Sequence, residues 1–217
     1  MSLLEPRTGY SRAEVVSDVV IHVSGVVLAL ASVPVLVAVA AFERGDRAAV
    51  LATAVYGAGL LAMLLASALY NVVGRGEWAW LLQRLDHAMI FAKIAATYTA
   101  FLLLAGAPTP WFVGALWAAA LLGIALQILS PVRFRLPSIV LYLGMGWAGL
   151  FILNPLMASL SPPVVVLIAV GGALYTLGVF FYLFDRLPFH YTIWHVLVLI
   201  ASMTLYAAIT LQVVQAA

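Results

Sequence analysis

Seven long apolar segments, nearly free of charged residues, dominate this sequence. Short breaks that contain Pro, Gly or charged residues separate them, and they cover about 18–42, 49–72, 85–105, 110–130, 136–156, 163–184 and 189–213. A helix needs about 20 apolar residues to cross the hydrocarbon core of a bilayer. Because backbone polar groups in lipid must be satisfied internally, these segments are expected to be helices. The sequence therefore predicts an all-α, seven-transmembrane helix bundle.

The composition agrees with a single integral membrane domain over residues 1–217. Hydrophobic residues make up 66% of the chain and charged residues only 8%, whereas a soluble domain has roughly a quarter of its residues charged. The net charge of +2 is too small to indicate a nucleic-acid partner, so membrane lipids are the expected partners. Cysteine is absent, which excludes disulfides and thiolate metal sites.

The N-terminal segment differs from a secretory signal peptide. Residues 1–16 carry Glu5, Arg7, Arg12 and Glu14 and contain no apolar core. We expect this segment to be a polar cytoplasmic lead-in, followed by a first span that is retained in the membrane.

The distribution of arginine predicts the orientation. Cytoplasmic loops carry an excess of Lys and Arg. One side of the predicted bundle has seven arginines, which are Arg7, Arg12, Arg75, Arg84, Arg133, Arg135 and Arg186. The other side has two, Arg44 and Arg47. The N-terminus is therefore expected in the cytoplasm and the C-terminus outside.

Polar residues gather at the cytoplasmic ends of four spans. Several are spaced by four residues and so share a helix face. Although helix ends are often polar, ionisable groups within membrane segments are candidates for function. We predict one pocket near the cytoplasmic surface, lined by Ser67, Asn71, Asp86, Lys93, Tyr191 and His195. Asp18 and His22 in the first span, His87 in the third and His190 in the seventh lie at similar depth.

Four segments carry a resemblance to a known family. They are Tyr10–Gly25, Ser67–Asn71, Arg84–Phe101 and Pro188–His195. Together they resemble motifs of the bacterial hemolysin III proteins, within the progestin and adipoQ receptor (PAQR) superfamily. The resemblance implies a multi-pass protein of the bacterial inner membrane, and it links the family to membrane homeostasis and a haemolytic phenotype.

The resemblance also implies a zinc site. In the family pattern three histidines hold the ion, at the positions of Asn71, Tyr191 and His195. Asp86 would hold a zinc-bound water, with Ser67 close by, and these two are the candidate catalytic residues. Three protein ligands and an open position are typical of catalytic zinc, which lowers the pKa of its bound water for attack on an amide or ester.

Two of the three zinc-ligand positions depart from that pattern. Asn71 and Tyr191 replace histidines, and only His195 remains. His190 lies five residues before His195, about 140° round the helix, so it is not in phase to substitute. We therefore predict a degenerate site, with no cofactor expected and no tightly bound zinc.

Three functions remain open, and whether the protein is an enzyme is undecided. The favoured one is a hemolysin III-like protein that binds lipid or serves membrane-lipid homeostasis. The alternative is a zinc-dependent hydrolase of lipid amides or esters with altered ligands, such as His195, Asp86 and His190. A third is a proton or ion pathway along Asp86, Lys93 and His195. A homo-oligomer is possible in each case.

Lys93 is a charged residue within the third predicted span, and its position suggests a role beside Asp86. It lies seven residues after Asp86, within about 20° of the same helix face. Its ammonium could then replace the missing metal as the positive charge beside the buried carboxylate of Asp86, either directly or through water.

The predicted topology is tested with reporter fusions. A phosphatase reporter that is active only outside the cytoplasm should be active when fused to the C-terminus and inactive in the second, fourth and sixth loops. A cytoplasmic C-terminus would overturn the orientation.

Overall fold

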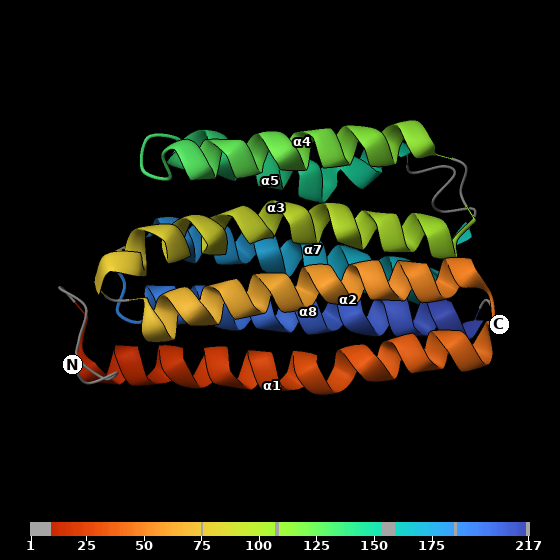
Figure 1. The fold of residues 1–217 in the computed structure, drawn as a ribbon, viewed down its shortest axis with the longest axis horizontal. Coiled ribbons are helices and arrows are strands. Elements are labelled where there is room, and N and C mark those ends of the chain that lie inside the picture. Colours follow the sequence, from red (N-terminus) through yellow and green to blue (C-terminus); the bar gives the residue numbers. More distant parts are fainter. Residues whose placement is uncertain (1–9, 75, 107–108, 153–158, 185, 216–217) are drawn as a thin grey trace.

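A computed structural model describes residues 10–74, 76–106, 109–152, 159–184 and 186–215. Within these ranges it is all-helical, and seven helices are long and apolar enough to cross a membrane. They run alternately up and down, so that α1 begins and α8 ends at opposite ends of the bundle (Figure 1). The predicted fold class is confirmed.

Seven α-helices and three shorter helical turns make up the described chain. The long helices are α1 (Arg12–Glu43), α2 (Arg47–Ala68), α3 (Ala79–Leu104), α4 (Pro110–Leu129), α5 (Arg135–Trp147), α7 (Pro162–Leu183) and α8 (His190–Gln215). A π-helical turn, η1 (Leu69–Val73), continues α2, and 3₁₀ turns η2 (Gly76–Trp78) and η3 (Ala148–Ile152) precede α3 and continue α5.

The first helix begins earlier than the sequence indicated. Ser11 is its N-cap: its hydroxyl accepts from the backbone N–H of Glu14 at 3.3 Å, and the Glu14 carboxylate accepts from the backbone N–H of Ser11 at 2.8 Å. This reciprocal pair satisfies two N–H groups that a helix start leaves unpaired. The helix thus begins six residues before the expected span, at Arg12 instead of about 18. That residues 1–16 are a polar cytoplasmic lead-in stays a prediction, and residues 1–9 lie outside the described ranges.

The third and fifth predicted spans also shift. α3 begins at Ala79 rather than near 85, because its polar first turns remain helical. Arg84 there donates from Nε to the carbonyl of Ile128 at 2.8 Å and from a terminal nitrogen to that of Trp80 at 3.1 Å. A long basic side chain can thus lie along the bundle end without ending a helix. The expected end of the fifth span, residues 153–156, lies outside the described ranges.

Packing within the bundle is uneven. α1 with α2, α2 with α3, α3 with α4, α7 with α8, and α1 with α8 form extensive contacts, so the first and last helices are neighbours. α5 contacts α3, α4 and α7 only sparsely. Over Arg135–Trp147, α5 therefore packs less extensively on its neighbours than the other long helices do.

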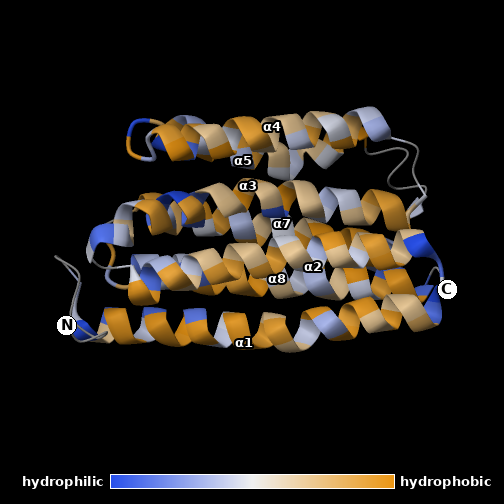
Figure 2. Cartoon of the chain, in the orientation of Figure 1, coloured by the Kyte–Doolittle hydropathy of each residue, from blue (hydrophilic) through white to orange (hydrophobic). Residues whose placement is uncertain are grey.

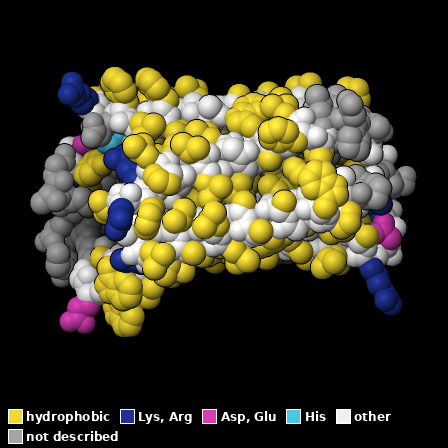
Figure 3. Space-filling model, turned by 90° about the horizontal axis from the view of Figure 1, so that it is seen from above, with side chains coloured by type: hydrophobic (Ala, Val, Ile, Leu, Met, Phe, Trp, Pro, Cys, Tyr) yellow, Lys and Arg dark blue, Asp and Glu magenta, His cyan; other side chains and the backbone are white. Residues whose placement is uncertain are grey.

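The outer surface matches a lipid environment. Large apolar side chains point outward along the helices, as with Val27, Leu30 and Val35 of α1, which are 54–60% exposed. Hydrophilic residues concentrate toward the ends of the helices (Figure 2). On the face in Figure 3, Lys, Arg, Asp and Glu lie at the two ends and a hydrophobic surface lies between them. A hydrophobic band with charged rims is the surface that a bilayer requires.

A close approach between α3 and α4 depends on Gly123. A Cβ at this position would overlap the ring of Phe91, which is fully buried and cannot move aside. We predict that Gly123→Ala destabilises the protein by about 1–3 kcal/mol through overpacking, measured by thermal unfolding in detergent. Gly114→Ala on the same helix is the control, since a Cβ there meets no atom within 4 Å. Equal stability of the two variants would contradict this packing.

Candidate functional site

The bundle brings the polar ends of four helices to one end of the molecule. α1, α3 and α8 begin there and α2 ends there, so residues distant in sequence meet (Figure 1). Six polar residues at this end are buried, each at most 9% exposed: Asp18, His22, Asn71, Asp86, His190 and His195.

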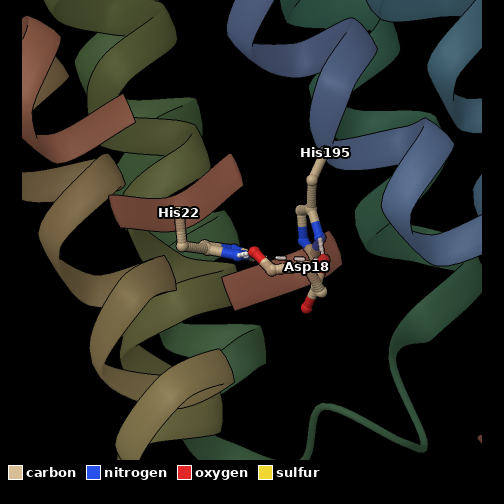
Figure 4. Close-up of side chains that lie close together, drawn as sticks. All are labelled: Asp18, His22 and His195. Atoms are coloured by element: carbon tan, nitrogen blue, oxygen red, sulfur yellow. Dashed lines mark hydrogen bonds and ion pairs between the residues drawn. The ribbon is translucent and has the colours of Figure 1, made fainter. Parts of the chain in front are cut away.

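Asp18 lies between two histidines (Figure 4). Its Oδ1 is 2.6 Å from Nδ1 of His195 and 3.8 Å from Nδ1 of His22. The two imidazole rings stand edge to face, with centroids 4.3 Å apart. With Asp18 ionised, Nδ1 of His195 must carry the proton of this short hydrogen bond, which joins the first helix to the last.

His22 links this pair to the end of α2. Its Nδ1 donates to the backbone carbonyl of Asp18 at 2.7 Å, because a carbonyl can only accept. Its Nε2 is 3.2 Å from the hydroxyl of Ser67. Asn71, in η1, donates its amide to the same hydroxyl at 3.3 Å and to the carbonyl of Ser67 at 2.9 Å.

His190 and Tyr191, in the first turn of α8, point in different directions. The ring of Tyr191 stands edge-on to that of His195, with centroids 4.5 Å apart. His190 instead places its Nε2 3.5 Å from the hydroxyl of Tyr10 and its Nδ1 3.3 Å from the carbonyl of Phe181.

The structure does not gather the altered ligand set predicted from His195, Asp86 and His190. The group of His and acidic side chains close enough to share a metal, within the described residues, is Asp18, His22 and His195. The helical phase of His190, which the sequence analysis noted, explains why it points away.

Lys93 is buried, 3% exposed, but its ammonium points to α7. Nζ donates to the hydroxyl of Tyr175 at 2.6 Å, and that hydroxyl is 2.6 Å from Oγ of Ser202. No ion pair joins Lys93 to Asp86 among the residues with described positions. A direct Lys93–Asp86 pair is therefore not formed, and the tyrosine of α7 supplies the acceptor. A contact between the two residues through water stays a prediction.

A cavity of about 180 Å³ opens between the helices at this level. Its walls include apolar side chains of α5, α7 and α8, such as Ile139, Leu143, Val179 and Val198. It is also lined by five of the six predicted pocket residues, Ser67, Asp86, Lys93, Tyr191 and His195. The sixth, Asn71, lines a smaller hollow together with Asp18 and Tyr191.

Two polar atoms in this cavity have no partner within the described chain. They are Oε1 of Gln127 and Oγ of Ser138, both buried and both on residues that line the cavity. An unsatisfied buried polar group costs about 1–3 kcal/mol. Water or the polar part of a ligand in the cavity would satisfy these atoms.

Sequence reasoning did not include Asp18 and His22 in the predicted site. The signal was present, because the two residues are four apart on one helix stripe at the depth of the other polar residues. The resemblance instead directed attention to the second and seventh spans. Asp18 and His22 can face His195 only because α1 and α8 are neighbours in the bundle. The sequence alone does not show that these two helices are neighbours.

Comparison with known proteins agrees with this architecture. Residues 11–206 match the family model described as Haemolysin-III related. The chain belongs to the hemolysin III family. It is 34% identical over 195 residues to the hemolysin-3 homolog of Bacillus subtilis (strain 168), covering 89% of this chain and 91% of that protein. It is 32% identical over 206 residues to hemolysin-3 of Bacillus cereus, covering 94% of both.

As a hemolysin III protein within the PAQR superfamily, this chain is a multi-pass protein of a bacterial membrane. The zinc site that the resemblance implies does not fit its residues at the family positions. The amide nitrogen of Asn71 is directed onto Ser67, and Tyr191 offers a ring edge to His195 instead of an imidazole. An amide and a neutral phenol are poor ligands for zinc compared with histidine.

The buried contact between Lys93 and Tyr175 makes a testable contribution to stability. Tyr175→Phe removes the acceptor of the Lys93 amine and should lower the free energy of unfolding by about 1–3 kcal/mol. In a Lys93→Met background the same change should cost less, because no buried amine is left unsatisfied. Unfolding in mixed micelles measures both losses.

Tyr142→Phe is the control for this cycle. Tyr142 lines the same cavity, and its hydroxyl forms no hydrogen bond that the structure records within the described residues. Its loss should therefore be small in both backgrounds. Strictly additive losses for Lys93 and Tyr175 would contradict the contact.

Proposed function

We propose that this protein binds a membrane lipid in the cavity and acts in membrane-lipid homeostasis. The observation that carries the proposal is the amphipathic lining of the cavity within the membrane-spanning part of the bundle. Ionisable and hydroxyl side chains lie in it together with the apolar walls formed by α5, α7 and α8. A lipid presents the same two chemistries, a polar head and an apolar chain.

The polar lining favours a hydrogen-bonding head group. The unpartnered oxygens of Gln127 and Ser138 accept hydrogen bonds, and Arg135 and Lys93 add donors. Arg135 already donates to the carbonyl of Tyr182 at 3.3 Å, which holds its guanidinium at the cavity wall. Ligand sites are mostly apolar with a few such polar groups that set orientation.

Access from the lipid phase is easiest beside α5. This helix contacts α3 and α7 sparsely, and residues on all three line the cavity. A lipid that enters here would keep its chain in an apolar environment throughout.

A zinc-dependent hydrolase of lipid amides or esters is the second candidate. The observation in its favour is that Ser67, His22 and His195 line the cavity beside Asp18, which could place a metal against a bound lipid. The proton or ion pathway along Asp86, Lys93 and His195 stays a prediction, tested by ion flux in liposomes. The possible homo-oligomer also stays a prediction.

A glycine at the cavity wall allows the lipid proposal to be tested. Gly146 of α5 lines the cavity, and a Cβ there meets no atom within 4 Å, so a larger side chain can occupy the space. We predict that Gly146→Phe protein purifies with at least about tenfold less bound lipid, because the ring fills the cavity. Native mass spectrometry and lipid extraction of protein in a lipid-free detergent measure the occupancy.

Gly144→Phe is the matched control. Gly144 lies two residues earlier on the same helix, is exposed, and also has open space at its Cβ, but does not line the cavity. Its variant should retain the lipid of the wild type. Equal lipid content in the two variants, or no bound lipid in the wild type, would contradict the proposal.

A further inference from the structure

We propose that Asp18, His22 and His195 bind a divalent metal ion, with zinc the best match to their donor atoms. The site lies at the wall of the cavity, and its ligand set differs from the one that the family resemblance implies. It does not require lipid to be bound, so it stands or falls separately from the proposed function.

The three side chains converge from two helices. Asp18 and His22 are one turn apart on α1 and face His195 of α8, and one ligand atom from each lies within 4.8 Å of the others. Zinc binds nitrogen and carboxylate oxygen at about 2.0–2.2 Å. An ion would take the place of the hydrogen bond between Asp18 and His195, with release of its proton, and rotations of the side chains would bring one atom of each residue to it.

The donor chemistry is that of a catalytic zinc centre. Two imidazoles and one carboxylate are a set that holds zinc with three protein ligands and leaves one position open. All three residues are buried, at most 9% exposed, so water would compete little for an ion bound here. A buried carboxylate also favours a cation, because an unpaired buried charge is costly.

The outer contacts orient His22 for this role. Ligating histidines usually donate their other ring N–H to a carbonyl or carboxylate, which fixes the ring and its tautomer. Nδ1 of His22 donates to the backbone carbonyl of Asp18, and so Nε2 carries the lone pair. That nitrogen faces the hydroxyl of Ser67 at 3.2 Å.

The position of Asp18 indicates where the open coordination site lies. His22, His195 and Ser67 line the main cavity, whereas Asp18 lines the smaller hollow behind it. An ion held by the three residues would therefore border the main cavity through His22 and His195. Its remaining position would then be taken by water or by a polar group of a molecule in the cavity.

The proposed ligands also compensate for the two histidines that Asn71 and Tyr191 replace. These residues remove two imidazoles from the family positions, while α1 contributes an imidazole and a carboxylate next to the one histidine that remains. The expectation of no tightly bound zinc considered only substitutes within the seventh span. A donor set shared between α1 and α8 reverses that expectation.

The test is metal content after exposure to zinc. Wild-type protein, stripped with chelator, incubated with zinc and desalted, should retain about one zinc per chain by elemental analysis. Asp18→Asn, His22→Gln and His195→Gln should each weaken zinc binding by more than about tenfold, since even outer-shell partners of zinc ligands are worth 10–100-fold. Competition with a chromophoric chelator measures the affinity.

Two controls separate this site from other histidines and from the family positions. His190→Gln removes a buried imidazole that contacts Tyr10 and the carbonyl of Phe181, and should retain wild-type affinity. Tyr191→Phe keeps the ring beside His195 and should also retain it. X-ray absorption at the zinc edge should show a shell of nitrogen and oxygen with two imidazoles.

Two results would overturn the proposal. One is a wild-type protein that retains no zinc. The other is retention of zinc at full affinity by folded His22→Gln protein, which would show that His22 is not a ligand. Folding of each variant is checked by size-exclusion chromatography and circular dichroism. Neither result alters lipid binding as tested with Gly146→Phe, so the two proposals fail independently.

Discussion

Lipid offers the backbone no hydrogen bonds, and the rest of this structure depends on that constraint. Every spanning segment must satisfy its own N–H and C=O groups, which leaves helices as the available form. Once the backbone is satisfied within each helix, polar side chains at membrane depth must find partners on other helices. The contacts of Asp18 with His195, His22 with Ser67, and Lys93 with Tyr175 are of this kind. They fix which helices face one another at the polar end.

The same constraint explains why much of the fold could be predicted from sequence. Apolar runs of sufficient length give the number of spans directly, and Pro and charged residues mark most of their ends. The ends of α1 and α3 were misplaced because polar residues such as Glu14 and Arg84 belong to helices when a cap or a neighbouring carbonyl satisfies them. Local charge alone does not distinguish such residues from a loop.

The sequence indicates the depth at which the polar side chains gather, but not which of them contact one another. Alternating helix direction places Ser67, Asp86 and His195 at one depth, and the cavity contains all three. Which side chains touch depends on the order of the helices around the bundle and on the rotation of each helix about its own axis. Because these helices are apolar on all faces, the sequence does not show which face of each points inward. Thus Lys93 was assigned to Asp86 on its own helix, when the nearer acceptor was Tyr175 on α7. Asp18 was left out because its partner lies 177 residues away.

That separation has a consequence for biogenesis. Chains are synthesised at about 5–20 residues per second, so α1 waits roughly 10–35 s before His195 exists to meet Asp18. During this interval Asp18 has His22 of its own helix beside it, but His195 has not yet been synthesised. The place of Asp18 in the first turns of α1, close to the membrane surface, lets water solvate it until the last helix arrives. A chain truncated before α8 would therefore lack the hydrogen bond between Asp18 and His195, and with it a polar contact that joins the first helix to the last.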